Sequence, residues 1–146
     1  MSRIYSQLFF HIVWSTSKRG DAISEEIKQL LEKTIQAKCR EMACILHAIG
    51  IAADHIHLLV SVPPNVRLSD FVRDVKGSSS HFVNQAVKLE TPLHWQRGYG
   101  ILSVSGHDEA KVIDYISNQW ERHKSGNIWP SLEKTETEPT RLQPDS

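Results

Sequence analysis

Two histidines, His55 and His57, stand two positions apart in the otherwise apolar stretch 55–62. Side chains alternate between the two faces of a β-strand, so both imidazoles are expected on one face and Ile56 on the other. Two neighbouring imidazoles can bind one metal ion, or they can both sit at a phosphate group. The alternative is a solvated polar face, because a His-x-His pattern also arises by chance.

A tyrosine and a glutamine, Tyr115 and Gln119, lie one helical turn apart in a helix predicted over residues 108–123. At 100° per residue they share a flank of this helix, beside an apolar stripe that contains Val112 and Ile116. A tyrosine oxygen can attack phosphorus if a nearby cation helps it, since the unperturbed pKa of tyrosine is about 10. A glutamine carbonyl oxygen suits a hard divalent ion. The alternative is a tyrosine that only packs its ring and hydrates its hydroxyl.

The elements that must position these residues follow from hydrophobic periodicity. Residues 3–14, 44–52, 54–62 and 98–105 are predicted to be strands, and Ala53 and Asp54 suit a tight hairpin turn between the second and third strands. A first helix is predicted over residues 24–42, with Ser24 as its N-cap. A second helix buries a stripe made of Leu68, Phe71, Val72, Val75, Ser79, Phe82 and Val83. Gly77 interrupts that helix, which suggests close packing or a bend.

The predicted order β-α-β-β-α-β-α indicates an α+β fold. Its first six elements match a ferredoxin-like antiparallel sheet with two helices on one face, followed by an additional C-terminal helix that carries Tyr115. The other sheet face is bare unless a partner, the third helix or a nucleic acid covers it. Residues 1–123 therefore form the predicted catalytic domain. Residues 124–146 are polar and are expected to be a disordered tail.

Composition sets limits on the function. The chain has 146 residues, of which 40% are hydrophobic and 23% charged, which suits one domain. No apolar run is long enough to span a membrane and no secretory signal is evident, so a cytoplasmic protein is expected. Its 17 basic and 17 acidic residues balance, so a nucleic-acid partner would need a local basic groove. That groove would have to gather Lys18, Arg19, Arg67, Arg73, Lys76, Arg97, Lys111 and Arg122, with Trp95 and Tyr99 as aromatic candidates for base stacking.

Four motifs in order resemble one known family. They are Phe10-His-Ile-Val-Trp-Ser-Thr, Phe71-Val-Arg-Asp-Val-Lys-Gly-Ser-Ser-Ser, Trp95-Gln-Arg-Gly-Tyr-Gly-Ile-Leu-Ser-Val-Ser and Tyr115-Ile-Ser-Asn-Gln. In addition, the stretch Asp54-His-Ile-His-Leu-Leu-Val contains a His-hydrophobic-His (HUH) motif. Together they resemble the single-tyrosine, single-strand DNA transposases of small insertion sequences and their relatives associated with repetitive palindromes. The resemblance covers about residues 3–123.

The resemblance implies a role for each candidate residue. His55, His57 and Gln119 would be ligands of a divalent ion, Mg²⁺ or Mn²⁺, and Tyr115 would be the nucleophile. The implied reaction cleaves single-stranded DNA at hairpin-containing element ends through a 5′-phosphotyrosine link, and then rejoins the strands. A homodimer is also implied, in which the tyrosine helix of one subunit serves the histidine pair of the other. No cofactor beyond the metal ion is expected.

Two other functions fit the same residues. One is a domesticated nickase that uses this chemistry on palindromic repeats. The other is a non-catalytic ferredoxin-like module that only binds nucleic acid. An RNA-recognition module would want aromatic side chains on its central strands, and the strand at residues 54–62 has histidines there and no aromatic ring of Phe, Tyr or Trp.

Overall fold

Four strands form one antiparallel sheet in the computed structural model, which describes residues 4–17, 22–119, 126, 133 and 135. The elements follow one another as β1 (Phe9–Ser15), α1 (Glu25–Glu41), β2 (Ile45–Ile51), β3 (His55–Ser61), α2 (Leu68–Ala86), β4 (Gly100–Val104) and α3 (Glu109–Ser117). The strand order is β2-β3-β1-β4, and each neighbouring pair is antiparallel. The predicted α+β, ferredoxin-like sheet is therefore confirmed.

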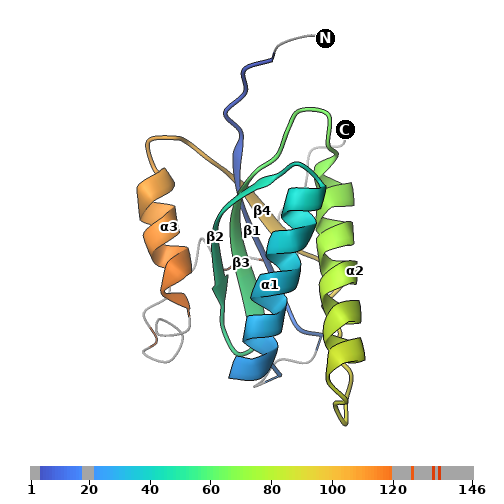
Figure 1. The fold of residues 1–146 in the computed structure, drawn as a ribbon. Helices are drawn as coiled ribbons and strands as arrows, with labels where there is room; N and C mark the ends of the chain where they lie inside the picture. Colours follow the sequence, from blue (N-terminus) through green and yellow to red (C-terminus); the bar gives the residue numbers. More distant parts are fainter. Residues whose placement is uncertain (1–3, 18–21, 120–125, 127–132, 134, 136–146) are drawn as a thin grey trace, which may run out of the picture.

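The sheet lies between two unequal layers of helices. Helices α1 and α2 lie side by side on one face, and α3 lies alone on the other (Figure 1). On β3, Ile56, Leu58 and Val60 are fully buried in the larger core together with residues of α1 and α2, as the alternation predicts. Leu59 joins a smaller core with residues of α3. Of the three covers considered for this face, the third helix is thus the one that the structure shows, over part of the face.

Helix α1 begins and ends close to the predicted residues. The Ser24 hydroxyl accepts a hydrogen bond from the Ile27 backbone N–H at 3.3 Å, which satisfies one of the donors left open at a helix start. Glu25 and Glu26 occupy the first turn, where negative charge interacts favourably with the helix dipole. Ala43, at φ 59°, ends the helix in the left-handed region.

The predicted hairpin between the second and third strands is confirmed. Ile51 pairs with Ile56, and the Ala52 N–H donates to the His55 carbonyl at 2.9 Å, so the turn at Ala53 and Asp54 is tight. Strand β3 ends at Ser61, shortly before two prolines that cannot donate to a sheet. The hairpin fixes the register of the histidine pair against β2.

The first strand is shorter than predicted. It begins at Phe9 rather than near residue 3, and Ile4 and Tyr5 are exposed. Phe9 pairs with Ser61 on one side and with Val104 on the other, the last residues of β3 and β4. A β-branched or aromatic sequence cannot extend a strand where neither neighbour offers backbone groups.

Two details of the predicted helices are wrong. Phe82, placed in the buried stripe of α2, is 41% exposed, whereas the adjacent Val83 is fully buried. Gly77 does not pack closely, since a Cβ built there meets no described atom within 4 Å. Helix α3 is described to Ser117, and the last part of the predicted helix, residues 120–123, lies outside the described residues. The predicted domain boundary at 123, and the tail at 124–146 apart from residues 126, 133 and 135, lie outside the described residues.

In the described part of the chain, every helix is too short or too polar to cross a lipid bilayer.

Candidate active site

The histidine pair lies on the face of β3 that α3 covers. His55 is 4% exposed and His57 is fully buried, and their ring centroids are 5.1 Å apart. Ile56 between them points into the larger core. The predicted shared face is confirmed. The alternative of a solvated polar face is wrong, because both imidazoles are shielded from water.

Tyr115 lies against this pair, at a ring-centroid distance of 5.9 Å from His57 in an edge-to-face arrangement. It is fully buried, and so is Gln119 one turn on. The prediction that these two residues lie on a flank outside the buried stripe is therefore wrong. Helix α3 buries Val112, Tyr115, Ile116 and Gln119, a set spaced by 3, 4 and 7 positions that forms a stripe in its own right.

A glycine on β2 lets α3 approach the sheet closely. Gly50 pairs with His57, and a Cβ at Gly50 would lie 1.9 Å from the Ile116 carbonyl oxygen and 2.7 Å from Gln119 Cγ. Only hydrogen at this position leaves room for the helix backbone. The close approach therefore brings Tyr115 and Gln119 to the strand position beside His57.

The side-chain amide of Gln119 has one satisfied end and one unsatisfied end. Its Nε2 donates to the Tyr115 carbonyl at 3.1 Å. Its Oε1 is buried and has no hydrogen-bond partner among the residues that the structure describes. A buried acceptor without a partner is costly, and such a group calls for an explanation such as an ion.

A carboxylate from the C-terminal segment lies at the centre of the site. Glu133 Oε1 is 3.0 Å from His55 Nε2, and Oε2 is 2.9 Å from His57 Nε2. The Tyr115 hydroxyl donates to Oε2 at 2.6 Å. The sequence analysis missed Glu133 because one acidic residue in a polar tail carries no local signal. Two imidazoles and one tyrosine hydroxyl thus each lie within hydrogen-bonding distance of this one carboxylate.

A second layer of contacts orients the two imidazoles. His55 Nδ1 lies 2.7 Å from Asp54 Oδ1, and His57 Nδ1 lies 2.7 Å from Nε2 of the buried His11 on β1. Both Nε2 atoms are thereby turned toward Glu133. No local pattern assigns His11 a role, because its place beside His57 depends on the register of β1 and β3, which pairs Val13 with His57.

The electrostatics follow from burial and these contacts. Burial, followed by the neighbouring His57, lowers the pKa of His11 to about 3, so its ring is neutral. Burial opposes a charge on His55, yet the hydrogen bonds with Glu133 and Asp54 outweigh it and raise the pKa of His55. Burial would raise the pKa of Glu133, but hydrogen bonds with the two histidines and Tyr115 hold it well below its usual range.

This donor set fits a divalent metal ion. One ligand atom from each of His55, His57 and Glu133 lies within 4.8 Å of the other two. Two ligand atoms about 2.1 Å from an ion and at right angles lie about 3.0 Å apart, and the two nitrogen-to-carboxylate separations of 3.0 and 2.9 Å match this value. The unpartnered Oε1 of Gln119 adds another oxygen donor of the kind that hard divalent ions bind.

Three comparisons with known proteins point to one family. A family model described as "Transposase IS200 like" matches residues 4–119. The transposase for insertion sequence element IS200 of Salmonella typhimurium is 31% identical over 122 residues, covering 80% of this chain and 80% of that protein. A solved structure of a candidate transposase from Deinococcus radiodurans has a TM-score of 0.66 at 28% identity and covers 82% of this chain and 97% of that chain. A REP-associated tyrosine transposase, solved bound to a REP hairpin, shares the fold with a TM-score of 0.62 at 18% identity and coverage of 89% and 81%.

Proposed function

This chain belongs to the IS200-like transposase family and is a DNA transposase, and we propose that it cleaves and rejoins single-stranded DNA through a covalent link to Tyr115. One observation carries this proposal. The Tyr115 hydroxyl and the Nε2 atoms of His55 and His57 converge on the same carboxylate, Glu133, at 2.6 to 3.0 Å. A nucleophile for phosphorus and ligands for a cation are thus within reach of one phosphate group.

In the cleavage step, the Tyr115 oxygen forms a bond to the scissile phosphorus. The bond from phosphorus to the 3′ oxygen of the upstream nucleotide breaks, and that oxygen takes up a proton. The products are a 5′-phosphotyrosine and a free 3′-hydroxyl. The hydroxyl proton of Tyr115 starts on a hydrogen bond to Glu133 Oε2, so this carboxylate is positioned to receive it. A 3′-hydroxyl that attacks the phosphotyrosine reverses the step and joins the strands.

His55 and His57 would hold the metal ion through Nε2, with oxygen ligands from Gln119 and Glu133. Mg²⁺ or Mn²⁺ suits this mixed set of nitrogen and oxygen donors, and when bound it polarises the phosphate and offsets its charge. The chain's own contribution is to keep both imidazoles turned to one point. Asp54 orients His55, and His11 orients His57.

The proposed partners are single-stranded DNA with hairpins at the ends of an element and a second copy of the chain. A structural neighbour was solved bound to a hairpin, which supports the choice of DNA. In this structure Tyr115 packs on His57 of its own chain, which differs from the exchange of tyrosine helices between subunits that the resemblance implies. Residues 1–123 form the catalytic domain in this proposal, and Glu133 reaches it from the tail. Such an enzyme would act in the cytoplasm, where its DNA lies.

The experiment is a denaturing gel of the protein with Mn²⁺ and single-stranded oligonucleotides from both flanks of its gene. With a 5′-phosphotyrosine, a label at the 3′ end of the DNA migrates with the protein, whereas a label at the 5′ end appears in a shorter free fragment. Tyr115→Phe should form no adduct, and Tyr5→Phe, at an exposed tyrosine outside the site, serves as the matched control that still forms one. An adduct in Tyr115→Phe, or the opposite labelling pattern, would contradict the proposal. Appearance of joined strands separates a transposase from a nickase.

A further inference from the structure

A histidine outside the metal-ligand candidates, His47 on β2, lies against the first turn of α3. Its Nε2 is 2.7 Å from the Ser61 hydroxyl oxygen on β3, and its Nδ1 is 3.6 Å from Glu109 Oε1 at the start of α3. Phe9 on β1 packs edge-to-face on the imidazole, with the ring centroids 5.2 Å apart. One partly buried ring thus contacts α3 and two other strands of the sheet.

A β-bulge turns His47 toward α3. In a regular strand, residues three positions apart point to opposite faces, so His47 and Gly50 would lie on different sides of the sheet. The pairing of β2 with β3 shifts between Leu46 and Ala48, so His47 is an extra residue in the strand. The extra residue moves the alternation by one position. His47 and Gly50 therefore lie on the same face, the one that α3 covers.

His47 and Gly50 contact α3 near its two ends. His47 faces Glu109, and Gly50 faces Ile116. The two positions on β2 are separated by about 10 Å of strand, since each residue adds about 3.3 Å. The two positions on α3 are separated by about 10.5 Å of helix, since each residue adds about 1.5 Å. The spacings match, so the helix follows β2 and contacts it at two separate points.

The two contacts differ in size, and this difference sets the tilt of the helix. At Gly50 no side chain intervenes, and the helix backbone at Ile116 lies directly against the strand. At His47 an imidazole lies between the strand and Glu109, and a separation of 3.6 Å is too long for a hydrogen bond, so the ring acts mainly as a spacer. Helix α3 has nine residues, and Asp108 gives it no side-chain cap bond among the described residues. A helix this short is directed by tertiary contacts rather than by its own stability.

The tilt of α3 decides where the Tyr115 oxygen lies. Tyr115 precedes Ile116, so its backbone lies close to the Gly50 contact and stays near the sheet. Its hydroxyl is at the far end of a long side chain, so a change in the helix angle moves the hydroxyl more than the backbone. Reacting groups must be held within about 0.5 Å and 10–20° of the productive geometry. Loss of the spacer would therefore displace the oxygen that now lies 2.6 Å from Glu133.

We propose that His47 is a positioning residue for DNA cleavage: with Gly50 it sets the tilt of α3 on the sheet and thereby aims the Tyr115 oxygen at the phosphate. This inference rests on the proposed cleavage chemistry and adds to it a residue outside the metal-ligand candidates. Gln119 lies at the Gly50 contact, so its place beside the histidines depends little on His47. Metal affinity should therefore change little when His47 is replaced.

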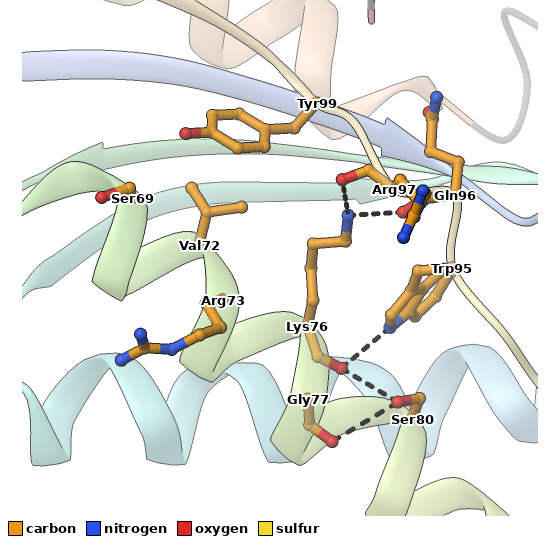
Figure 2. Close-up of a pocket in the computed structure, with 10 residues that line it drawn as sticks. All are labelled: Ser69, Val72, Arg73, Lys76, Gly77, Ser80, Trp95, Gln96, Arg97 and Tyr99. Atoms are coloured by element: carbon orange, nitrogen blue, oxygen red, sulfur yellow. Dashed lines mark hydrogen bonds between the residues drawn. The ribbon is translucent and has the colours of Figure 1, made fainter.

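DNA affinity should change little as well. The basic and aromatic side chains that the sequence analysis expected to gather do so in part in a pocket between α2 and the segment before β4, which Figure 2 shows with Arg73, Lys76, Arg97, Trp95 and Tyr99. Helices α2 and α3 lie on opposite faces of the sheet (Figure 1). The Lys76 ammonium donates to the carbonyl oxygens of Gln96 at 2.6 Å and Gly98 at 3.1 Å, so that face is held by contacts of its own.

The test measures the rate of cleavage separately from binding. His47→Ala removes the spacer, and His81→Ala, at an exposed histidine of α2, is the matched control. In single-turnover reactions with saturating Mn²⁺ and oligonucleotide, His47→Ala should form the Tyr115 adduct about 10- to 100-fold more slowly, the effect of a misplacement of up to about 1 Å. Its affinities for Mn²⁺ and for the oligonucleotide should stay within about twofold of wild type, and His81→Ala should keep all three values.

Two further measurements exclude a role in stability alone. His47→Gln restores a long side chain whose amide can face Ser61, and it should recover most of the rate. Nitroxide labels on Ala110→Cys in α3 and Leu102→Cys in β4, both exposed positions, report the tilt by double electron–electron resonance without DNA or metal. The distance between the labels should shift in His47→Ala and return in His47→Gln.

The outcomes separate this inference from the proposed function. An unchanged rate or an unchanged label distance in folded His47→Ala would overturn the positioning role. If His47→Ala fails to fold, Glu109→Ala removes the other side of the contact and decides the matter by the same two readouts. A shifted label distance in a protein that forms no Tyr115 adduct would keep the role of His47 in placing α3 and refute the cleavage chemistry.

Discussion

Replacing Gly50 with alanine tests how the nucleophile is placed. The new Cβ would lie 1.9 Å from the Ile116 carbonyl oxygen, which is backbone and cannot rotate away. Real Cβ atoms essentially never approach another heavy atom within 3.0 Å, so this separation must grow by at least 1.1 Å. Helix α3 must therefore move away from β2, or the strand must bend.

The displacement has two expected consequences. Overpacking of this size costs about 1–3 kcal/mol of unfolding free energy. Tyr115 and Gln119 move with the helix backbone, and a misplacement of about 1 Å of a reacting group can cost about 100-fold in rate. The rate of adduct formation should thus fall far more than the fraction of folded protein, which stays near one.

The assay pairs Gly50→Ala with Gly77→Ala. Urea unfolding would give the stability of each, and single-turnover formation of the covalent adduct with Mn²⁺ would give the rate. Gly77→Ala meets no described atom within 4 Å and should stabilise the protein by about 0.4–1 kcal/mol, with an unchanged rate. Wild-type stability and rate in Gly50→Ala would refute the reasoning that this glycine sets the distance between α3 and the histidines.

Three further perturbations address the chemistry of the site. Tyr115→Phe keeps the ring in place, so the unfolding free energy should fall by less than about 1–2 kcal/mol while the adduct disappears on a denaturing gel; retention of the adduct would exclude Tyr115 as the nucleophile. His11→Ala removes the partner of His57 Nδ1 and should weaken Mn²⁺ binding about 10- to 100-fold, as measured by calorimetry, and His11→Gln should restore part of the affinity. Equal Mn²⁺ affinity in the wild type and both variants would rule out an orienting role for His11. With any metal ion removed by a chelator, Glu133 has a lowered pKa, so its contribution to the stability of the fold is present above pH 4.5. His55 has a raised pKa, so its contribution is full below pH 6.5 and is lost as the pH rises further. Glu133→Gln should therefore cost more stability at pH 5.5 than at pH 9 in urea unfolding, and an equal cost at both pH values would contradict this pairing.

Local pattern was enough to predict most of the fold and one half of the site. The alternation along β3 places His55 and His57 on one face and Ile56 on the other, because this periodicity is a property of any extended backbone. The N-cap at Ser24 and the tight turn before His55 are likewise local, since they depend on contacts between residues close in sequence. The four motifs in order also pointed to the family, which the comparisons confirm.

Tertiary structure alone decided how the other half of the site meets the histidines. Which face of α3 is buried depends on the surface that the helix packs against. Here the face that includes Tyr115 packs on the sheet face that carries the imidazoles. Gly50 allows this approach only because the hairpin register sets it beside His57. His11 and Glu133 lie 46 and 76 positions from His57 along the chain. Periodicity reports on neighbours in sequence, whereas contacts over such separations form only when the whole sheet and its covering helix are assembled.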